Sequence, residues 1–188
     1  MTELSPPESL GQDLRILRKQ RGLTLIQLAD RVERSVGWLS QVERNISAPS
    51  TEEIAELSKA LDVSVESFLG RSPALPGEAD HVVRKSNRRP LGPRVDGMFE
   101  ELLSPDLTDD FEVVHSTFQP GAARLDPVTR ATQEVGYIVS GELHITIGKE
   151  TFHLTPGDSF RIRGEPFAWE NQGTEPCIAI WVIAPPVY

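Results

Sequence analysis

Few residues in this chain combine the types and the spacing that metal or acid–base chemistry requires. The chain of 188 residues has four histidines and one cysteine. His144 and His153 each alternate with apolar neighbours, as residues on the outer face of a strand do. His115 is isolated, and His81 lies at the edge of a segment rich in proline and glycine. Cys177 lies in the apolar run CIAIWVIA, which favours a buried, inert thiol over a redox switch.

A second kind of chemistry is suggested by residues 35–45, SVGWLSQVERN. Three of these residues (Val36, Leu39 and Val42) have the apolar character and spacing of core positions. The remaining set combines a glycine, an aromatic ring, an amide and a cation, which is unusual for a solvated helix face. A short helix with this outer face is expected to contact a partner, so the surrounding elements decide what that partner is.

Residues 1–70 are predicted to form a compact domain of five short helices. In Ser5-Pro6-Pro7-Glu8, a serine is followed by proline and, three residues after the serine, by glutamate, which predicts the capped start of a first helix. Gly22 is placed to end that helix. Thr24 and Gln27 form a second capping box, and Ser35 is predicted to cap a third helix. The start of the fourth helix is predicted at Pro49-Ser50-Thr51-Glu52-Glu53, and a fifth helix is predicted from Ser64 to Gly70.

The rest of the chain has a different character. Residues 71–81 are rich in proline and glycine without a period, which predicts a linker. Residues 82–188 contain short alternating runs separated by recurrent turn signals, which is typical of an antiparallel sandwich or barrel. The clearest predicted strands are 111–115, 143–147 and 159–163, with turns such as Gly148-Lys149 between them.

The charge distribution also divides the chain. The net charge of −9 argues against a general nucleic-acid binder. Residues 11–50, however, carry seven lysines and arginines against four acidic residues, whereas residues 95–188 carry five against fifteen. A basic front and an acidic back suit a chain whose front approaches phosphates. We expect a cytoplasmic protein, because no run could span a bilayer and the N-terminus lacks the pattern of a secretory signal.

The helical half resembles the lambda-repressor-like helix-turn-helix of the XRE family of regulators. A helix over 25–32, a tight turn and a helix over 36–44 form the geometry that places a second helix in the DNA major groove. The resemblance covers residues 10–69 and rests on several spaced elements: LRILR, GLT, WLSQVE, PS and LSKALDVS.

The resemblance implies which residues contact double-stranded DNA. Val36, Gly37 and Gln41 take positions that read base edges, where Gln41 could pair with adenine and Val36 could meet a thymine methyl. Phosphate or backbone contacts are implied for the flanking positions Ser35, Trp38, Arg44 and Asn45. Trp38 could equally be a packing residue, and Arg18 and Glu43 resemble a structural ion pair.

Two positions depart from the family pattern. Glu33 stands where a turn glycine is usual, and Arg34 stands where an apolar residue is usual. We expect a stiffer turn and, because Glu33 adds an acidic group near the interface, weaker non-specific DNA binding.

Residues 134–171 resemble the central part of a cupin barrel, a double-stranded β-helix of jelly-roll type. The matched elements are Glu134, YIVSGEL, LTPGD and Asn171, and the resemblance extends over residues 82–188. Cupin enzymes hold a metal with three histidines and one glutamate. This chain has Pro127, Val128, Thr129 and Arg130 where two histidines would fall, and Phe167 at the third. One carboxylate does not hold a transition metal, so we expect no metal, no cofactor and no catalytic residues.

The barrel could still bind a small-molecule effector. Phe167 and Trp169 are two residues apart, so on a strand they would point to the same face and could form an aromatic wall beside Glu134. A buried carboxylate is costly alone, so Glu134 is paired by Arg124 or Arg130, protonated, or matched by a cationic ligand. The alternative is a barrel filled by its own side chains.

Together the two resemblances imply a cytoplasmic transcriptional regulator. One such helical domain makes few phosphate contacts, so we expect a homodimer, joined through the cupin domain, on a pseudo-palindromic operator. Two alternatives stay open: a metal-dependent cupin enzyme fused to a DNA-binding domain, and a constitutive DNA-binding module without an effector.

Overall fold

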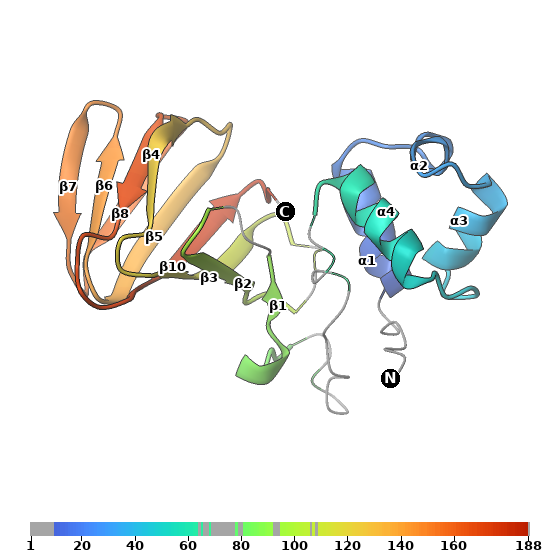
Figure 1. The fold of residues 1–188 in the computed structure, drawn as a ribbon, viewed down its shortest axis with the longest axis horizontal. Helices are drawn as coiled ribbons and strands as arrows, with labels where there is room; N and C mark the ends of the chain where they lie inside the picture. The colour runs from blue at the N-terminus through green and yellow to red at the C-terminus, as the bar shows by residue number, and fades with distance from the viewer. Residues whose placement is uncertain are drawn as a thin grey trace. The chain divides into compact units, whose positions relative to one another are not determined.

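The computed structural model describes residues 10–63, 65, 68, 78, 81–91, 95–105, 107 and 109–187. They fall into two compact units (Figure 1). The first takes in the described residues up to Leu91, together with Pro105 and Leu107, and the second takes in those of 95–104 and 109–187. Within the described part of the chain, no helix is long and apolar enough to cross a membrane. The predicted cap at residues 5–8 and most of the predicted linker lie outside it.

Four α-helices form the body of the first unit: α1 (Leu10–Gln20), α2 (Leu25–Arg31), α3 (Val36–Glu43) and α4 (Thr51–Leu61). Gly22 follows α1 with a φ of 66°, and its N–H donates to the Lys19 carbonyl, so the predicted glycine stop is confirmed. The fifth predicted helix falls on residues of which only Val65 and Phe68 are described. The described helices therefore number four rather than five.

The core of the first unit forms where apolar residues recur at helical spacing. Leu10, Leu14 and Leu17 are buried along α1, as the spacing predicts. Of the three positions on α3 with core spacing, Leu39 and Val42 are buried, whereas Val36 is 39% exposed, so the prediction was wrong for Val36. The other two helices contribute five more buried apolar residues: Leu28, Ala29, Ile54, Leu57 and Leu61.

Two buried ion pairs connect distant parts of this unit. The predicted pair between Arg18 and Glu43 is confirmed, with Nε–Oε1 at 2.6 Å and Nη2–Oε2 at 2.9 Å. A second pair joins Asp13 of α1 to Arg89, with Nη2–Oδ2 at 2.5 Å. Arg89 belongs to the two-residue strand β1 (Arg89–Pro90), which follows the 3₁₀-helix η2 (Lys85–Asn87). Residues just beyond the predicted linker thus pack within the first unit.

The second unit consists of two antiparallel sheets, as expected for a jelly-roll barrel. Within the second unit, the strands of the larger sheet follow the order β2-β3-β10-β5-β8, and those of the smaller sheet the order β4-β9-β6-β7 (Figure 1). The bounds of these strands are β2 Met98–Leu102, β3 Glu112–Phe118, β4 Ala123–Val128, β5 Gln133–Ser140, β6 Leu143–Ile147, β7 Glu150–Leu154, β8 Ser159–Ile162, β9 Phe167–Glu170 and β10 Cys177–Ala184.

Burial alternates strictly along the central strands of the larger sheet. β3, β5 and β10 each bury every second residue, so one face of the sheet lines the interior and the other points outward. The predicted turn at Gly148-Lys149 joins β6 and β7, and Gly148 there has a φ of 63°. A glycine suits this position because a side chain would disfavour the left-handed conformation.

Candidate DNA-binding surface and effector site

The α2–turn–α3 segment is fixed by caps at both helix starts. Thr24 and Gln27 form the predicted capping box of α2. Ser35 caps α3 as predicted, and its Oγ accepts a hydrogen bond from the Trp38 N–H at 3.1 Å. Such caps satisfy amide groups that a helix leaves without partners, so they define where α3 begins.

The turn between these helices bends at Glu33. Its φ is 52°, and the N–H groups of Glu33 and Arg34 donate to the carbonyls of Asp30 and Ala29. A left-handed conformation costs a residue with a side chain about 1 kcal/mol relative to glycine. The position that departs from the family pattern is therefore one where glycine has a physical advantage.

α3 separates an internal face from an external face. Leu39 and Val42 are buried, and the ion pair of Glu43 with Arg18 fixes the end of the helix. Gly37, Gln41 and the flanking residues Ser35, Val36 and Arg44 are exposed. The residues expected to read base edges are thus brought together on one accessible face.

Gly37 is not required by packing within the domain. A Cβ at this position would meet only Ser35 Oγ, at 3.9 Å. Gly11 of α1 differs, because a Cβ there would lie 2.3 Å from the Val42 carbonyl oxygen. The glycine on α3 faces open space, where a partner's surface could approach the backbone.

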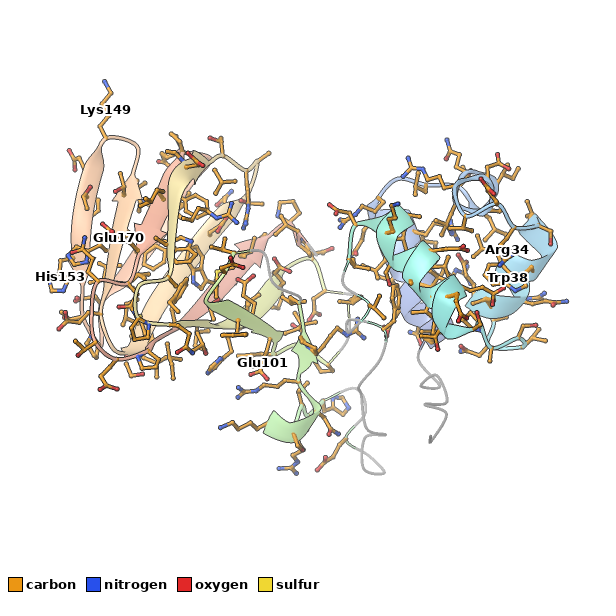
Figure 2. The ribbon with its side chains drawn as sticks, viewed as in Figure 1. Arg34, Trp38, Glu101, Lys149, His153 and Glu170 are labelled. Atoms are coloured by element: carbon orange, nitrogen blue, oxygen red, sulfur yellow. The ribbon has the colours of Figure 1, made fainter. Side chains whose placement is uncertain are left out.

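Trp38 is half-buried rather than fully exposed. The Arg34 guanidinium lies over the indole ring, with its Cζ 5.8 Å from the ring centroid. Figure 2 labels Arg34 and Trp38 next to each other at α3. Arg34 also pairs with Glu53 of α4, Nε to Oε1 at 3.3 Å. Trp38 therefore packs partly within the domain, which is the alternative that the sequence left open, and Arg34 takes the place of the usual apolar residue.

Asn45 has a structural role that the sequence analysis missed. It follows α3 with a φ of 55°, and its Oδ1 accepts a hydrogen bond from the Gly11 N–H at 2.8 Å. Asparagine is one of the few residues that tolerate this conformation after a helix, so the signal was present in the sequence. Gln41 and Arg44 also bond locally, to the Ser47 hydroxyl and the Ser40 carbonyl respectively.

In the second unit, Glu134 lies on the interior face of β5. It is fully buried, and its register partners are Ile162 and Ile183. Its Oε1 accepts a hydrogen bond from the Thr132 hydroxyl at 2.7 Å and lies 3.7 Å from Arg130 Nη1. Its Oε2 has no hydrogen-bond partner among the described residues. Of the two predicted partners, Arg130 is the one that pairs with Glu134.

The aromatic residues predicted near Glu134 are part of the barrel interior. Phe167 is buried, and the Arg130 guanidinium lies 5.7 Å from its ring centroid. Trp169 is buried beside Phe118, with their centroids 4.6 Å apart. Arg124 lies on β4 opposite Trp169 in the strand register, and the described contacts of Glu134 do not include it. Glu134, Arg130 and Phe167 therefore form the compact centre of the candidate effector site.

The donor set does not suit the metal that cupin enzymes hold. Pro127 and Val128 lie on β4, and the buried Phe167 stands where the third histidine would be. No group of three or more histidine, cysteine, aspartate or glutamate side chains in the described part of the chain is arranged to hold a metal ion. A single carboxylate beside an arginine is a poor ligand set for a divalent cation.

The remaining candidate groups lie apart from Glu134. His144 and His153 stack across β6 and β7 with ring centroids 4.6 Å apart, and His153 Nε2 lies 3.1 Å from Glu142 Oε2. Cys177 is buried as predicted, and burial raises the pKa of its thiol to about 11. A neutral thiol at physiological pH is a poor nucleophile.

Comparisons with known proteins match both units. A family model described as a helix-turn-helix domain matches residues 9–68, and one described as a cupin domain matches residues 114–183. The HTH-type transcriptional regulator PuuR of Escherichia coli is 24% identical over 182 residues, covering 95% of this chain and 96% of that protein. The HTH-type transcriptional regulator SinR of Bacillus subtilis is 36% identical over 61 residues, covering 32% of this chain and 55% of that protein.

Two solved structures can be set beside this fold. An HTH_3 family transcriptional regulator from Vibrio cholerae has a TM-score of 0.43 at 19% identity, covering 95% of this chain and 96% of that chain. The cupin domain of an XRE family transcriptional regulator from Enterobacter cloacae has a TM-score of 0.43 at 27% identity, covering 49% of this chain and 100% of that chain.

Fold and site thus define a two-domain protein with a helix-turn-helix domain followed by a cupin domain. The similarity to PuuR extends through both domains. The chain resembles the XRE-type transcriptional regulators that carry a C-terminal cupin domain, with matches in both of its domains.

Proposed function

We propose that this regulator binds a pseudo-palindromic DNA operator as a cytoplasmic homodimer, joined through its cupin domain, which also binds a small-molecule effector. The observation that carries the DNA-binding part is the exposed face of α3, with Gly37 and Gln41 outward and Leu39 and Val42 buried. A short helix held this way, after a capped helix and a tight turn, suits the major groove. The proposed linker spans residues 71–81, and the described residues 82–91 that follow it group with the first unit.

Each residue on this face has a proposed role in DNA binding. Gln41 pairs with adenine through its amide, and Val36 contacts a thymine methyl. Ser35 and Arg44 contact phosphates, and Trp38 lies near the backbone through its exposed edge. Asn45 lies near the DNA backbone at the end of α3, where its Oδ1 accepts the hydrogen bond from the Gly11 N–H.

The effector site centres on Glu134, Arg130 and Phe167, with Trp169 and Arg124 at its margin. Because Arg130 already lies beside the carboxylate, a simple cation is a weaker match than the sequence suggested. Glu134 Oε2 is a buried acceptor without a hydrogen-bond partner among the described residues. A buried acceptor of this kind is costly, so we propose a small polar effector that donates a hydrogen bond to Oε2.

We propose no enzymatic activity. A metal-dependent cupin reaction would require ligands at positions held here by Pro127, Val128 and Phe167. A constitutive module without an effector remains the competing proposal, and its prediction is that no small molecule stabilises the cupin domain.

The DNA-binding proposal is tested by selecting operators from a random duplex library with the full chain. Gln41→Ala is expected to weaken binding to the selected operator about tenfold and to relax the preference at one position in each half-site. Gln172→Ala, an exposed glutamine of the cupin domain, serves as the matched control. Equal binding by wild type and Gln41→Ala would contradict the assignment of α3.

The effector proposal is tested by a thermal-shift screen of small polar metabolites, because a ligand of the folded state raises its stability. A hit is expected to change the operator affinity and to lose its effect in Glu134→Gln. If saturating hits leave the operator affinity unchanged, the sensor part of the proposal is wrong.

A further inference from the structure

The centre of the outward face of the larger cupin sheet carries a contiguous group of apolar residues. Val113 on β3, Val182 on β10 and Val135 on β5 lie side by side in the strand register. The next row places Ile180 of β10 beside Tyr137 of β5, and Val139 follows further along β5. Val135, Tyr137 and Val139 are each exposed by almost half, at 47%, 48% and 47%. We define these six residues as the outer apolar face.

Exposed and buried residues alternate along β5, so the exposure of its apolar residues follows the regular geometry of a strand. On β5, Glu134, Gly136 and Ile138 point into the barrel, and Val135, Tyr137 and Val139 point out. Isolated exposed apolar residues are common, but a contiguous group on one sheet face is typical of an interaction surface.

Within the second unit, the outermost strands of this sheet, β2 and β8, carry opposite charges on the same outward side. Glu101 of β2 lies in register with His115, and its Oε2 is 3.9 Å from His115 Nδ1. Arg161 of β8 lies in register with Val135 at the other edge. Arg163 follows on the same side, so the β8 edge keeps a net positive charge although Glu165 is near both arginines.

This arrangement is self-complementary about one twofold axis. β10 is the central strand of the order β2-β3-β10-β5-β8. An axis running along β10 would place β10 on β10, β3 on β5, and the Glu101 edge of each copy on the Arg161 edge of the other. The two residues lie one row apart, about 7 Å along the strands, which an arginine side chain can span. An axis running across the strands would instead set Glu101 against Glu101.

We propose that the outer apolar face is the dimer interface, with a second copy of this chain packed on it about a twofold axis along β10. The inference rests on the homodimer of the proposed function and specifies its surface. In a symmetric interface of this kind every contact occurs twice, so one substitution introduces two altered pairs. The charged edges set the orientation, and the apolar centre excludes water.

The test is the dimer dissociation constant of the full chain, measured by sedimentation equilibrium. Arg161→Glu is expected to weaken the dimer about tenfold, because it sets like charges against each other at both edges. Arg161→Glu combined with Glu101→Arg is expected to return the dissociation constant to within about threefold of wild type. Lys149→Glu is the matched charge reversal at the tip of the β6–β7 hairpin, away from this sheet (Figure 2).

The apolar centre has a test of its own. Tyr137→Asp is expected to weaken the dimer at least as much as Arg161→Glu, whereas Leu125→Asp, at an exposed apolar residue of β4, is expected to leave it unchanged. Circular dichroism melting of each variant separates loss of the dimer from loss of the fold.

The three possible negative results distinguish the homodimer, its interface and its orientation. A wild-type chain that is monomeric at all concentrations would overturn the homodimer of the proposed function and this interface with it. A wild-type dimer that Arg161→Glu and Tyr137→Asp leave intact would overturn the interface alone. A double variant no tighter than Arg161→Glu would overturn the orientation.

Discussion

At the scale of single residues, Gly37 gives the clearest sign that α3 has an external partner. A glycine inside an exposed helix costs about 0.5–1 kcal/mol relative to alanine. The domain itself offers room for a methyl group, since the nearest atom to an added Cβ is Ser35 Oγ at 3.9 Å. A residue that is unfavourable for the fold and not needed for packing supports the proposal that DNA approaches the backbone at this position.

Gly37→Ala is therefore expected to have opposite effects on stability and on binding. The free energy of unfolding of the helical domain should rise by about 0.5–1 kcal/mol, because alanine favours the helix. Operator affinity should fall about tenfold, because the methyl group would meet the base edges. Circular dichroism at 222 nm and fluorescence anisotropy measure the two quantities, and undiminished affinity would place Gly37 away from DNA.

Glu33 combines a backbone cost with an acidic charge near the DNA-binding face. Glu33→Gly is expected to raise the free energy of unfolding by about 0.5–1 kcal/mol, since φ there is 52°. Glu33→Gln keeps the backbone cost and removes the charge, so it should strengthen binding to non-specific DNA without raising stability. If Glu33→Gln stabilises the domain as much as Glu33→Gly, the charge rather than the backbone is responsible.

Cys177 makes the cupin domain sensitive to alkaline pH. Burial raises the pKa of this thiol to about 11, so the unfolded chain ionises first as the pH rises. The stability that depends on a neutral thiol is fully present below about pH 8.5 and is lost as the pH rises towards 11. Chemical denaturation at several pH values should show this loss in wild type, and a Cys177→Ala chain with the same alkaline loss would contradict its assignment to the thiol.

At the scale of elements, β5 links the interior of the barrel to its outward face. Glu134 points inward and Val135 points outward from consecutive positions of the same strand. An effector that bonds to Glu134 would therefore act on the strand that also supplies Val135 and Tyr137 to the proposed interface. Coupling of this kind requires that the effector bind two states of the dimer with different affinities.

The hydrogen bond from Thr132 is expected to hold the Glu134 carboxylate in place. Thr132→Val should lower the free energy of unfolding of the cupin domain by about 1–3 kcal/mol, because a buried carboxylate oxygen loses its donor. Thr151→Val removes an exposed hydrogen bond to Thr146 and should cost much less. Urea denaturation measures both losses. Equal losses in the two variants would contradict the prediction that Glu134 depends on the hydrogen bond from Thr132.

Features that depend on residues close together in the sequence could be predicted, whereas contacts between distant residues could not. The caps at Thr24 and Ser35 and the glycine stop at Gly22 were predicted because each involves residues within three or four positions. The pair of Asp13 with Arg89 was not, because the two residues are 76 positions apart and only the folded chain brings them together. In the candidate effector site, the sequence indicated Glu134 and Arg130 but could not choose between Arg124 and Arg130.

At the scale of the whole molecule, two units of different character carry separate tasks. The helical unit is expected to make few phosphate contacts through α3, so a single copy is expected to bind DNA weakly. The cupin unit has an outward apolar face that could join two copies. Operator recognition in this account therefore depends on the dimer, which fixes the distance between two recognition helices.

The central claim is best tested by titrating the full chain onto its selected operator and onto the same operator with five base pairs inserted between the half-sites. The insertion rotates one half-site by about half a helical turn, so that two linked recognition helices cannot reach both sites from one side. We expect two chains per operator and a loss of affinity of at least about a hundredfold on insertion. Unchanged affinity, or binding of a single chain with full affinity, would contradict the central claim.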